Sequence, residues 1–298
     1  MCNNISIPIF MSFDEGYAPY ASTCIASICD NTKKHIEFFI IDCGIKNDTK
    51  NKVELLKKIY QNLSIEWISF DTENFLKDFK TCFHFSKAMY GRIFIPILKK
   101  EIDKAIYLDV DTICLSDISE LFDESLDGYP LGAVWEDYME EKGHNKEHLT
   151  RLGIKEGHKY FNSGVLLLDL KAWREKNITN TVLGYEPLLK DKLIFPDQDL
   201  LNYSFANGYK ILNERYNVTA PRARKHYSMG KLVDCVIRHF EGGKKPWLCH
   251  PLKLERMKSN HIGMKSFWHY AKKTSFYNEM ISKFPIYFLF FKNRKKIK

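Results

Sequence analysis

Two aspartates separated by one residue follow a short apolar run in the first half of the chain. Residues 105–108 (Ala-Ile-Tyr-Leu) precede Asp109-Val110-Asp111-Thr112. A bend after such a strand can turn both carboxylates toward one hard divalent cation, which in turn can neutralise a diphosphate. An Asp-x-Asp pair is also common in solvated turns and helix caps, so both interpretations stand. Its place after an apolar strand favours a functional site.

A second group of candidate ligands lies far downstream, after the apolar run Val233–Ile237. His239 can supply an imidazole ligand, and Gly242 allows the backbone to approach phosphate oxygens closely. Lys245 can place a positive charge on a diphosphate. Alone, His239 is more often a structural histidine and Lys245 part of a solvated turn. The combination with the distant aspartates favours one ligand bound by all of them.

The elements that must position these residues alternate between strand-like and helix-like segments. Short apolar runs predict strands, and three-to-four spacing of apolar residues predicts helices. The predicted strands are 5–11, 36–41, 65–70, 105–108, 164–168 and 193–195, the last one stopped by Pro196. The predicted helices are 18–30, 47–60 and 90–98. This order predicts an α/β fold with a mixed, mostly parallel sheet flanked by helices, with ligands beyond the carboxyl ends of the strands.

Six ordered segments resemble glycosyltransferase family 8, the retaining enzymes of GT-A fold that include bacterial lipopolysaccharide galactosyl- and glucosyltransferases. The segments are Ser12–Tyr17, Tyr90–Ile93, Leu108–Asp111, Tyr160–Val165, Pro196–Asp199 and His239–Trp247. The resemblance spans residues 5–250 and implies a nucleoside-diphosphate-sugar donor, usually UDP-linked, with Mn²⁺ held by Asp109, Asp111 and His239. Carboxylates with one imidazole suit Mn²⁺ better than Mg²⁺, which remains the alternative.

The same resemblance implies which residues bind the donor. Asp14 and Tyr17 would hold the uracil, although a capping Asp and a packed aromatic would look the same in sequence. The donor-binding set is Asp14, Tyr17, Arg92, Asp109, Val110, Asp111, Asn162, Gly242 and Lys245. The family often has Asn where this chain has Gly16, so one side-chain contact to the nucleotide is missing here.

The catalytic set implied by the resemblance is Gln198, Asp197 and Asp137. Asp197 and Asp137 would hold the hydroxyls of the donor sugar, with Glu136 as a direct competitor of Asp137. Gln198 would lie near the anomeric carbon. Since an amide is a weak nucleophile, we expect retention by attack of the acceptor on the face that the diphosphate leaves, with Asp137 and Asp197 as the alternative nucleophiles.

Most of the positive charge lies at the C-terminus. The formal net charge is +8, and residues 276–298 carry six Lys/Arg against one Glu, a net of +5. The nearly balanced remainder argues against a nucleic-acid partner. Aromatic and basic residues from Phe284 onward have the composition of an interfacial anchor. We therefore expect a GT-A (Rossmann-like) domain over 1–250 and a helical, aromatic and basic membrane-associating tail over 251–298. A packed helix with a frayed basic end is the alternative.

Three features indicate the compartment. The 8 cysteines show no zinc-ligand spacing, which favours a reducing environment. The N-terminus shows no signal peptide, and no apolar run approaches the ~20 residues that cross a bilayer. We expect a cytoplasmic protein held peripherally at the cytoplasmic face of the inner membrane.

The expected activity is metal-dependent transfer of galactose or glucose from a UDP-sugar to a saccharide, such as a lipopolysaccharide, another glycolipid or a cell-surface glycan. The acceptor loops would be 136–160 and 219–230, and Arg222 and Arg224 in the second loop suggest an anionic acceptor. Two alternatives are a haloacid dehalogenase-type phosphatase, whose nucleophile loop resembles Asp109–Ile113, and a non-catalytic binder of sugar nucleotides.

Overall fold

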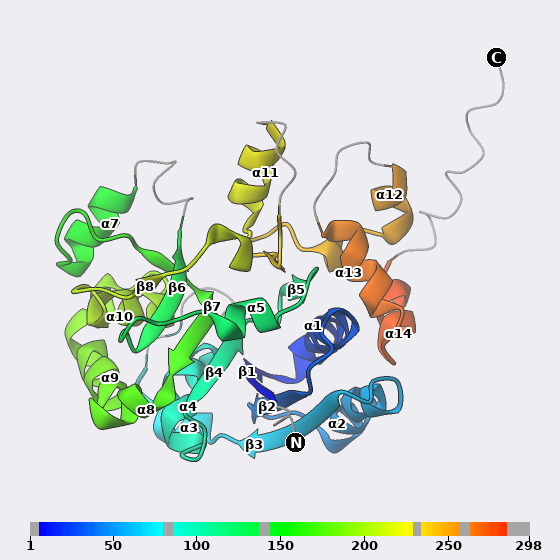
Figure 1. Ribbon diagram of the computed structural model, residues 1–298, viewed down its shortest axis with the longest axis horizontal. Coiled ribbons are helices and arrows are strands. Elements are labelled where there is room, and N and C mark those ends of the chain that lie inside the picture. The colour runs from blue at the N-terminus through cyan, green and yellow to red at the C-terminus, as the bar shows by residue number, and fades with distance from the viewer. Residues whose placement is uncertain are drawn as a thin grey trace.

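A seven-stranded mixed sheet forms the centre of the structure, a computed structural model that describes residues 6–79, 81, 86–136, 144–228, 234–256 and 263–284 (Figure 1). The strands are β1 Ile7–Phe13, β2 Ile36–Asp42, β3 Leu63–Ser69, β4 Lys104–Leu108, β6 Leu131–Trp135, β7 Phe161–Asp169 and β8 Lys210–Ile211. They lie in the order β3-β2-β1-β4-β7-β6-β8. β7 runs antiparallel to its neighbours β4 and β6, and the other neighbouring pairs are parallel. The predicted fold class is therefore confirmed.

Burial on both faces of the sheet explains why its strands are almost continuously apolar. Successive side chains of a strand point to opposite faces. In β1, Ile9 and Met11 belong to one core cluster and Phe10 belongs to the other. Side chains must be apolar on both faces when helices cover both, as in most parallel sheets.

Helices cover both faces. Their bounds are α1 Ala18–Asn31, α2 Asn47–Glu54, α3 Thr72–Phe75, α4 Gly91–Leu98, α5 Ser119–Asp123, α7 Asn145–Leu152, α8 Leu170–Glu175, α9 Ile178–Leu189, α10 Pro196–Ser204, α11 Ala220–Ser228, α12 Pro251–Arg256, α13 Met264–Ala271 and α14 Tyr277–Ser282. The 3-10 helices are η1 Glu15–Tyr17, η2 Leu55–Lys58, η3 Lys87–Tyr90, η4 Lys190–Lys192, η5 Glu214–Tyr216 and η6 Pro246–Leu248. On one face α1 lies beside α13 (Figure 1), while α4, α8, α9 and α10 supply the core of the other.

One predicted strand is wrong. Residues 193–195 form no strand, and Pro196 opens helix α10 instead of stopping a strand. Proline suits the first turn of a helix, because its fixed φ is helical and the missing N–H needs no partner there. The buried carboxylate of Asp199 accepts hydrogen bonds from the backbone N–H groups of Ile194 (2.7 Å) and Phe195 (3.0 Å), which fixes the bend into the helix.

A small second sheet joins two segments that are far apart in the sequence. Its strands are β5 (Thr112–Cys114) and β9 (Ile237–His239), and their antiparallel register pairs Thr112 with His239. β5 starts directly after Asp111, so this pairing carries His239 to the carboxyl end of β4. The two groups of ligands found in the sequence are thereby brought to one edge of the large sheet.

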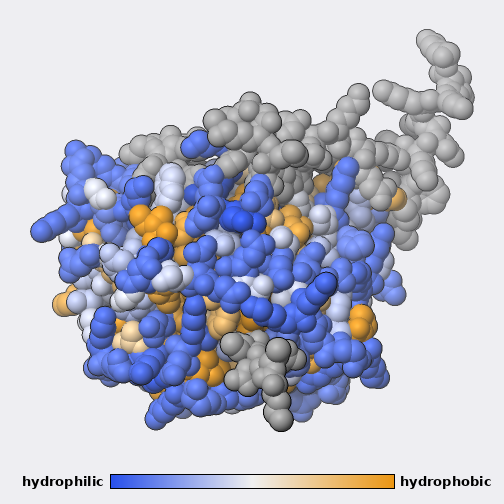
Figure 2. Space-filling model, viewed as in Figure 1, coloured by the Kyte–Doolittle hydropathy of each residue, from blue (hydrophilic) through white to orange (hydrophobic). Residues whose placement is uncertain are grey.

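The C-terminal part is helical as far as it is described. Phe284 packs on Trp268 of α13, with 6.1 Å between ring centroids, and the predicted anchor residues beyond it lie outside the described residues. Among the described helices, none has the length and apolar character needed to span a membrane. Hydrophilic residues cover most of the face seen in Figure 2, with apolar side chains in small groups between them.

Candidate active site

Two carboxylates and an imidazole converge where β4 ends. The Nε2 atom of His239 lies 3.1 Å from Oδ1 of Asp111 and 4.0 Å from Oδ2 of Asp109. The candidate ligand atoms of the three residues all lie within 4.8 Å of one another. Neighbouring ligands of an octahedral cation with bonds of ~2.1 Å lie ~3 Å apart, which is close to the 3.1 Å between Asp111 and His239, so the three residues could hold a divalent cation. Mixed oxygen and imidazole donors fit Mn²⁺.

A glycine on β7 makes room for this cluster. A Cβ atom on Gly164 would lie 2.4 Å from Cε1 of His239 and 2.7 Å from Oδ2 of Asp109. The backbone of the same residue accepts a hydrogen bond of 2.8 Å from the N–H of Asp109, which holds the end of β4 in place. Only glycine allows the strand to approach both ligands this closely.

The charges within the cluster compensate one another. The ammonium of Lys245 forms an ion pair with Oδ2 of Asp111. Burial alone would raise the pKa of Asp111, but the charges of Lys245 and His239 outweigh burial and hold this pKa well below its usual range. Burial alone would lower the pKa of His239, yet the net shift is upward because of Asp111 and Asp109. A cation held here would take the place of a proton on Nε2 of His239, the nitrogen that faces Asp109 and Asp111.

Arg92 on α4 links Asp109 to α10. Its Nη2 donates to Oδ1 of Asp109 at 2.7 Å, and its Nε lies 3.1 Å from Oδ2 of Asp197. Nη1 donates to the backbone oxygen (2.6 Å) and the hydroxyl (2.8 Å) of Ser163. The residue is 5% exposed, so Arg92, predicted to bind the donor, is a buried cation that links two predicted site carboxylates.

The first turn of α10 presents its polar side chains to β7. Asp197 accepts from the hydroxyl of Ser163 at 3.1 Å, and Oε1 of Gln198 accepts from the backbone N–H of Ser163 at 2.9 Å. Burial is the main cause that raises the pKa of Asp197 to about 6, and Asp109 adds to it, while Arg92 opposes it. Asp197 is thus linked to Asp109 through Arg92, and Gln198 lies beside Ser163.

Asn162 stands between two acidic side chains. Its Nδ2 donates to Oε2 of Glu136 at 2.9 Å and lies 3.4 Å from Oε2 of Glu241. Burial, followed by the charge of Glu136, raises the pKa of Glu241 to about 7. Asp137, preferred over Glu136 from the sequence, lies outside the described residues. No role was predicted for Glu241 from the sequence, although its position between His239 and Gly242 is a signal that it lies near the site.

The predicted uracil-binding residues lie after β1. Asp14 caps η1 by accepting from the N–H of Gly16 at 3.1 Å, and the Tyr17 side chain is 38% exposed. The ring of Tyr17 packs edge-on against Tyr20, which stacks on Trp247 at 3.9 Å between centroids. Two segments of the family resemblance thus meet through their aromatic rings.

Two other predicted donor contacts are backbone positions. The side chain of Val110 is buried in the core cluster that contains Ile9, so a donor could reach only its backbone. Gly242 has φ of 68° in the turn after β9, a left-handed conformation that favours glycine. Among the described residues, no atom other than those of its chain neighbours lies within 4 Å of a Cβ added to it, so these residues leave its backbone accessible to a ligand.

The expectation of a basic acceptor loop at 219–230 needs correction. Residues 220–228 form helix α11, and Arg222 is only 1% exposed. Its guanidinium donates to the backbone oxygens of Asn217 and Trp135, each at 2.9 Å. Arg222 therefore stabilises the interior, whereas Arg224 is exposed.

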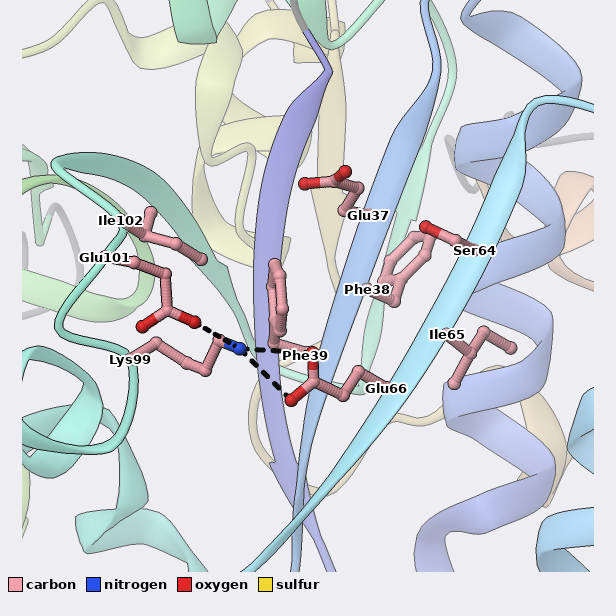
Figure 3. A pocket seen from close by; sticks show the side chains of 9 residues that line it. All are labelled: Glu37, Phe38, Phe39, Ser64, Ile65, Glu66, Lys99, Glu101 and Ile102. Carbon is pink, nitrogen blue, oxygen red and sulfur yellow. Dashed lines mark hydrogen bonds and ion pairs between the residues drawn. The ribbon is translucent and has the colours of Figure 1, made fainter.

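A surface pocket elsewhere on the sheet has no part in this site. It is lined by residues toward the amino ends of β2 and β3 and by the segment after α4 (Figure 3). Its cation, Lys99, pairs with Glu66 and Glu101. Ligands of open α/β sheets bind at the opposite, carboxyl ends of the strands.

Comparisons with known proteins agree with this geometry. The sequence matches the family model of Glycosyl transferase family 8 over residues 8–250. A putative glycosyltransferase of Haemophilus influenzae is 32% identical over 243 residues, which cover 80% of this chain and 72% of that protein. A lipopolysaccharide 1,2-glucosyltransferase of Escherichia coli K12 is 29% identical over 259 residues, covering 83% and 73% of the two chains.

The fold is also that of a solved glycosyltransferase. A crystal structure of the galactosyltransferase LgtC with donor and acceptor sugar analogues has a TM-score of 0.78 at 24% identity, covering 90% of this chain and 96% of that one. The phosphatase alternative expects its nucleophile loop after the first strand, whereas Asp109 follows β4. The family match spans the site residues from Asp14 to Lys245, and the chain therefore belongs to glycosyltransferase family 8.

Proposed function

We propose that this glycosyltransferase transfers galactose or glucose from a UDP-sugar to a saccharide acceptor with retention of configuration. The observation that carries the proposal is the convergence of Asp109, Asp111, His239 and Lys245 at the carboxyl end of β4. With a divalent cation bound, such a cluster would carry the positive charge that complements the diphosphate of a nucleotide sugar. The names of two relatives, a lipopolysaccharide 1,2-glucosyltransferase and a lipopolysaccharide 1,3-galactosyltransferase, support a hexose as the transferred group.

Departure of UDP builds negative charge on the β-phosphate, and this charge is what the site must stabilise. A bound Mn²⁺, held by Asp109, Asp111 and His239, would supply Lewis-acid stabilisation of the leaving oxygens. Lys245 adds a positively charged ammonium group. When the donor binds, this group would leave its ion pair with Asp111 and pair with a phosphate oxygen. The Gly242 turn brings backbone N–H groups close without a side chain in the way. Asp14 and Tyr17 would hold the uracil at the end of β1.

The sugar would lie between this cluster and α10. Asn162, Asp197 and Glu136 offer buried hydrogen-bonding groups for its hydroxyls, and Gln198 would lie near the anomeric carbon. Asp197 is held by Arg92 and Ser163, which positions it to accept hydrogen bonds. We therefore propose same-face substitution, with the departing phosphate accepting the proton of the acceptor. A glycosyl adduct on Asp197 trapped in mass spectrometry would contradict this route.

The acceptor is proposed to be a glycolipid reached at the cytoplasmic face of a membrane. The C-terminal composition supports this, since Lys292 to Lys298 carry 5 basic residues after an aromatic run. Removal of residues 286–298 should weaken binding to vesicles that contain anionic lipid and should leave turnover on a soluble acceptor unchanged. Undiminished vesicle binding by the truncated protein would contradict the anchor.

A donor screen tests the activity itself. UDP release is measured with UDP-galactose, UDP-glucose and related donors, with Mn²⁺, with Mg²⁺ and with chelator, and acceptors are then tried with the preferred donor. We expect one UDP-hexose to dominate and chelation to abolish turnover. Donor binding without turnover on any acceptor would favour the non-catalytic alternative, and undiminished turnover in chelator would remove the metal from the proposal.

A further inference from the structure

A buried chain of side-chain amides connects His239 to the backbone of β7. Nδ1 of His239 lies 3.0 Å from Oδ1 of Asn217, and Nδ2 of Asn217 donates to Oδ1 of Asn162 at 2.9 Å. The same oxygen of Asn162 accepts the backbone N–H of Gly164 at 3.0 Å. Asn217 is fully buried at 0% exposure, and Asn162 and His239 are nearly so, at 8% and 3%.

The direction of each hydrogen bond in this series of amides follows from two groups whose roles are fixed, the backbone N–H of Gly164 and the carboxylate of Glu136. The N–H of Gly164 can only donate, so the atom of Asn162 that faces it is the oxygen. The amino group of Asn162 then faces the carboxylate of Glu136, which accepts. Asn217 must present its own amino group to the oxygen of Asn162, because two carbonyl oxygens would repel each other. Its oxygen is left to face Nδ1 of His239.

This order determines the protonation of the imidazole. A carbonyl oxygen beside Nδ1 requires a proton on Nδ1, so Nε2 is the nitrogen whose lone pair can bind a cation. Nε2 is also the atom that faces Asp109 and Asp111. With Asn217 reversed or removed, the proton of a neutral ring could sit on Nε2, and that tautomer has no lone pair to offer the cation.

The backbone holds Asn217 beside His239. The backbone N–H of Asn217 donates to the backbone oxygen of Glu214 at 3.2 Å, and the backbone oxygen of Asn217 accepts from buried Arg222 at 2.9 Å. The next residue, Val218, pairs with β9, since the N–H of His239 donates to its backbone oxygen at 3.1 Å. These bonds hold the backbone of Asn217, and therefore the start of its side chain, beside His239. Arg222 contributes through its hydrogen bond to the backbone oxygen of Asn217.

We propose that Asn217 is a positioning residue of the cation site, which keeps the proton of His239 on Nδ1 and directs Nε2 toward Asp109 and Asp111. The inference rests on the proposed function, because it takes these three residues as the holders of a divalent cation. Such partners of metal-ligating histidines orient the ring, and their loss commonly costs 10–100-fold in metal affinity.

Two substitutions of one residue separate this role from simple packing. Asn217→Ala removes the acceptor for Nδ1, whereas Asn217→Asp keeps an acceptor there and replaces the amino group that faces Asn162 with a carboxylate oxygen. The measurement is free Mn²⁺ by electron paramagnetic resonance, without nucleotide. We expect Asn217→Ala to bind Mn²⁺ ~10–100-fold more weakly than wild type and Asn217→Asp to stay much closer to wild type. Equal affinities of wild type and Asn217→Ala, or equal losses in both variants, would overturn the inference.

A matched control and a direct signature complete the test. Asn202 is equally buried, at 0% exposure, and bonds the backbone of Phe161 and Gln198, so Asn202→Ala should lower stability without changing Mn²⁺ affinity. An equal loss of affinity in this control would overturn the inference. Nitrogen NMR of histidine-labelled protein loaded with Zn²⁺ should show protonated Nδ1 and metal-bound Nε2 in wild type, and the opposite assignment would refute it. Wild type that binds no Mn²⁺ would overturn the cation site and this inference together, whereas equal tight binding by Asn217→Ala overturns the inference alone.

Discussion

Replacement of Gly164 by alanine tests the geometry of the cation site with a single methyl group. The new Cβ would lie 2.4 Å from Cε1 of His239 and 2.7 Å from Oδ2 of Asp109. Ordinary contacts between heavy atoms are about 3.5 Å or longer, so the ring would have to move by ~1 Å. The imidazole ring cannot move freely, because Asn217 and Asp111 interact with its two nitrogens.

The displacement has an expected size in function and in stability. A shift of ~1 Å in a reacting group can cost 10²-fold in rate, and we expect about that loss in UDP release from Gly164→Ala. Overpacking of a filled site costs ~1–3 kcal/mol in the free energy of unfolding. Affinity for Mn²⁺ should fall by ~10-fold or more, because two of the three ligands move.

The assay compares Mn²⁺ affinity, initial rates of UDP release and denaturant unfolding in wild type and variant. Gly184→Ala in α9 is the matched control, because within the described part of the chain no atom outside the backbone of its own helix turn and its chain neighbours lies within 4 Å of the added Cβ. The control should gain ~0.5–1 kcal/mol from helix propensity and keep wild-type Mn²⁺ affinity. If Gly164→Ala binds Mn²⁺ as tightly as wild type and turns over at the wild-type rate, the close approach of β7 to the ligands is wrong.

Three further substitutions test the charges of the site. Lys245→Met removes the ammonium that faces the departing phosphate and should lower kcat by ~10²–10³-fold in a UDP-release assay, and a loss below tenfold would contradict its role. Asp197 has a pKa of about 6 in the folded protein against an ordinary 3.8, so its neutral form stabilises the fold and this contribution is lost as pH rises through 6. Asp197→Asn should therefore exceed wild type in unfolding free energy by about 3 kcal/mol at pH 8, with the difference shrinking toward zero near pH 4, and a difference that does not change with pH would contradict the assignment. Arg222→Ala leaves buried carbonyl groups without donors and should cost ~3 kcal/mol in chemical denaturation, whereas Arg224→Ala at an exposed position should cost almost nothing, and equal effects of the two would contradict the burial of Arg222.

Much of the site could be predicted because it depends on strand ends. Apolar runs mark buried strands, and residues just after them collect at one edge of a parallel sheet. Asp109 follows β4 of the large sheet, so its place at this edge was within reach of pattern reasoning. His239 ends β9 of the small antiparallel sheet, and its meeting with Asp109 depends on the pairing of β9 with β5. The short distance between β7 and the side chains of Asp109 and His239 depends on Gly164. This role of Gly164 can be recognised only from the packing of β7 against the two side chains.

Other features depend on tertiary contacts that sequence patterns do not carry. The run 193–195 with a following proline fits a strand end and a helix start equally well, and the hydrogen bonds to Asp199 decide for the helix. Arg222 has the sequence context of a surface charge, and its burial is explained by tertiary contacts, which include hydrogen bonds to two backbone oxygens and an ion pair with Glu214. Asn217 carries no motif at all, and its importance is visible only beside His239.

The pairing of β5 with β9 also has a consequence for the order of events in folding. Lys245 and its partner Asp111 are separated by 134 positions, and His239 is almost as far along the chain. A nascent polypeptide long enough to form β1 to β4 already contains Arg92, the partner of Asp109, but it still lacks His239 and Lys245, the two partners of Asp111. Contacts between such distant positions form slowly. The pairing of β9 with β5 is therefore the step that completes the cluster proposed to bind the cation and the diphosphate.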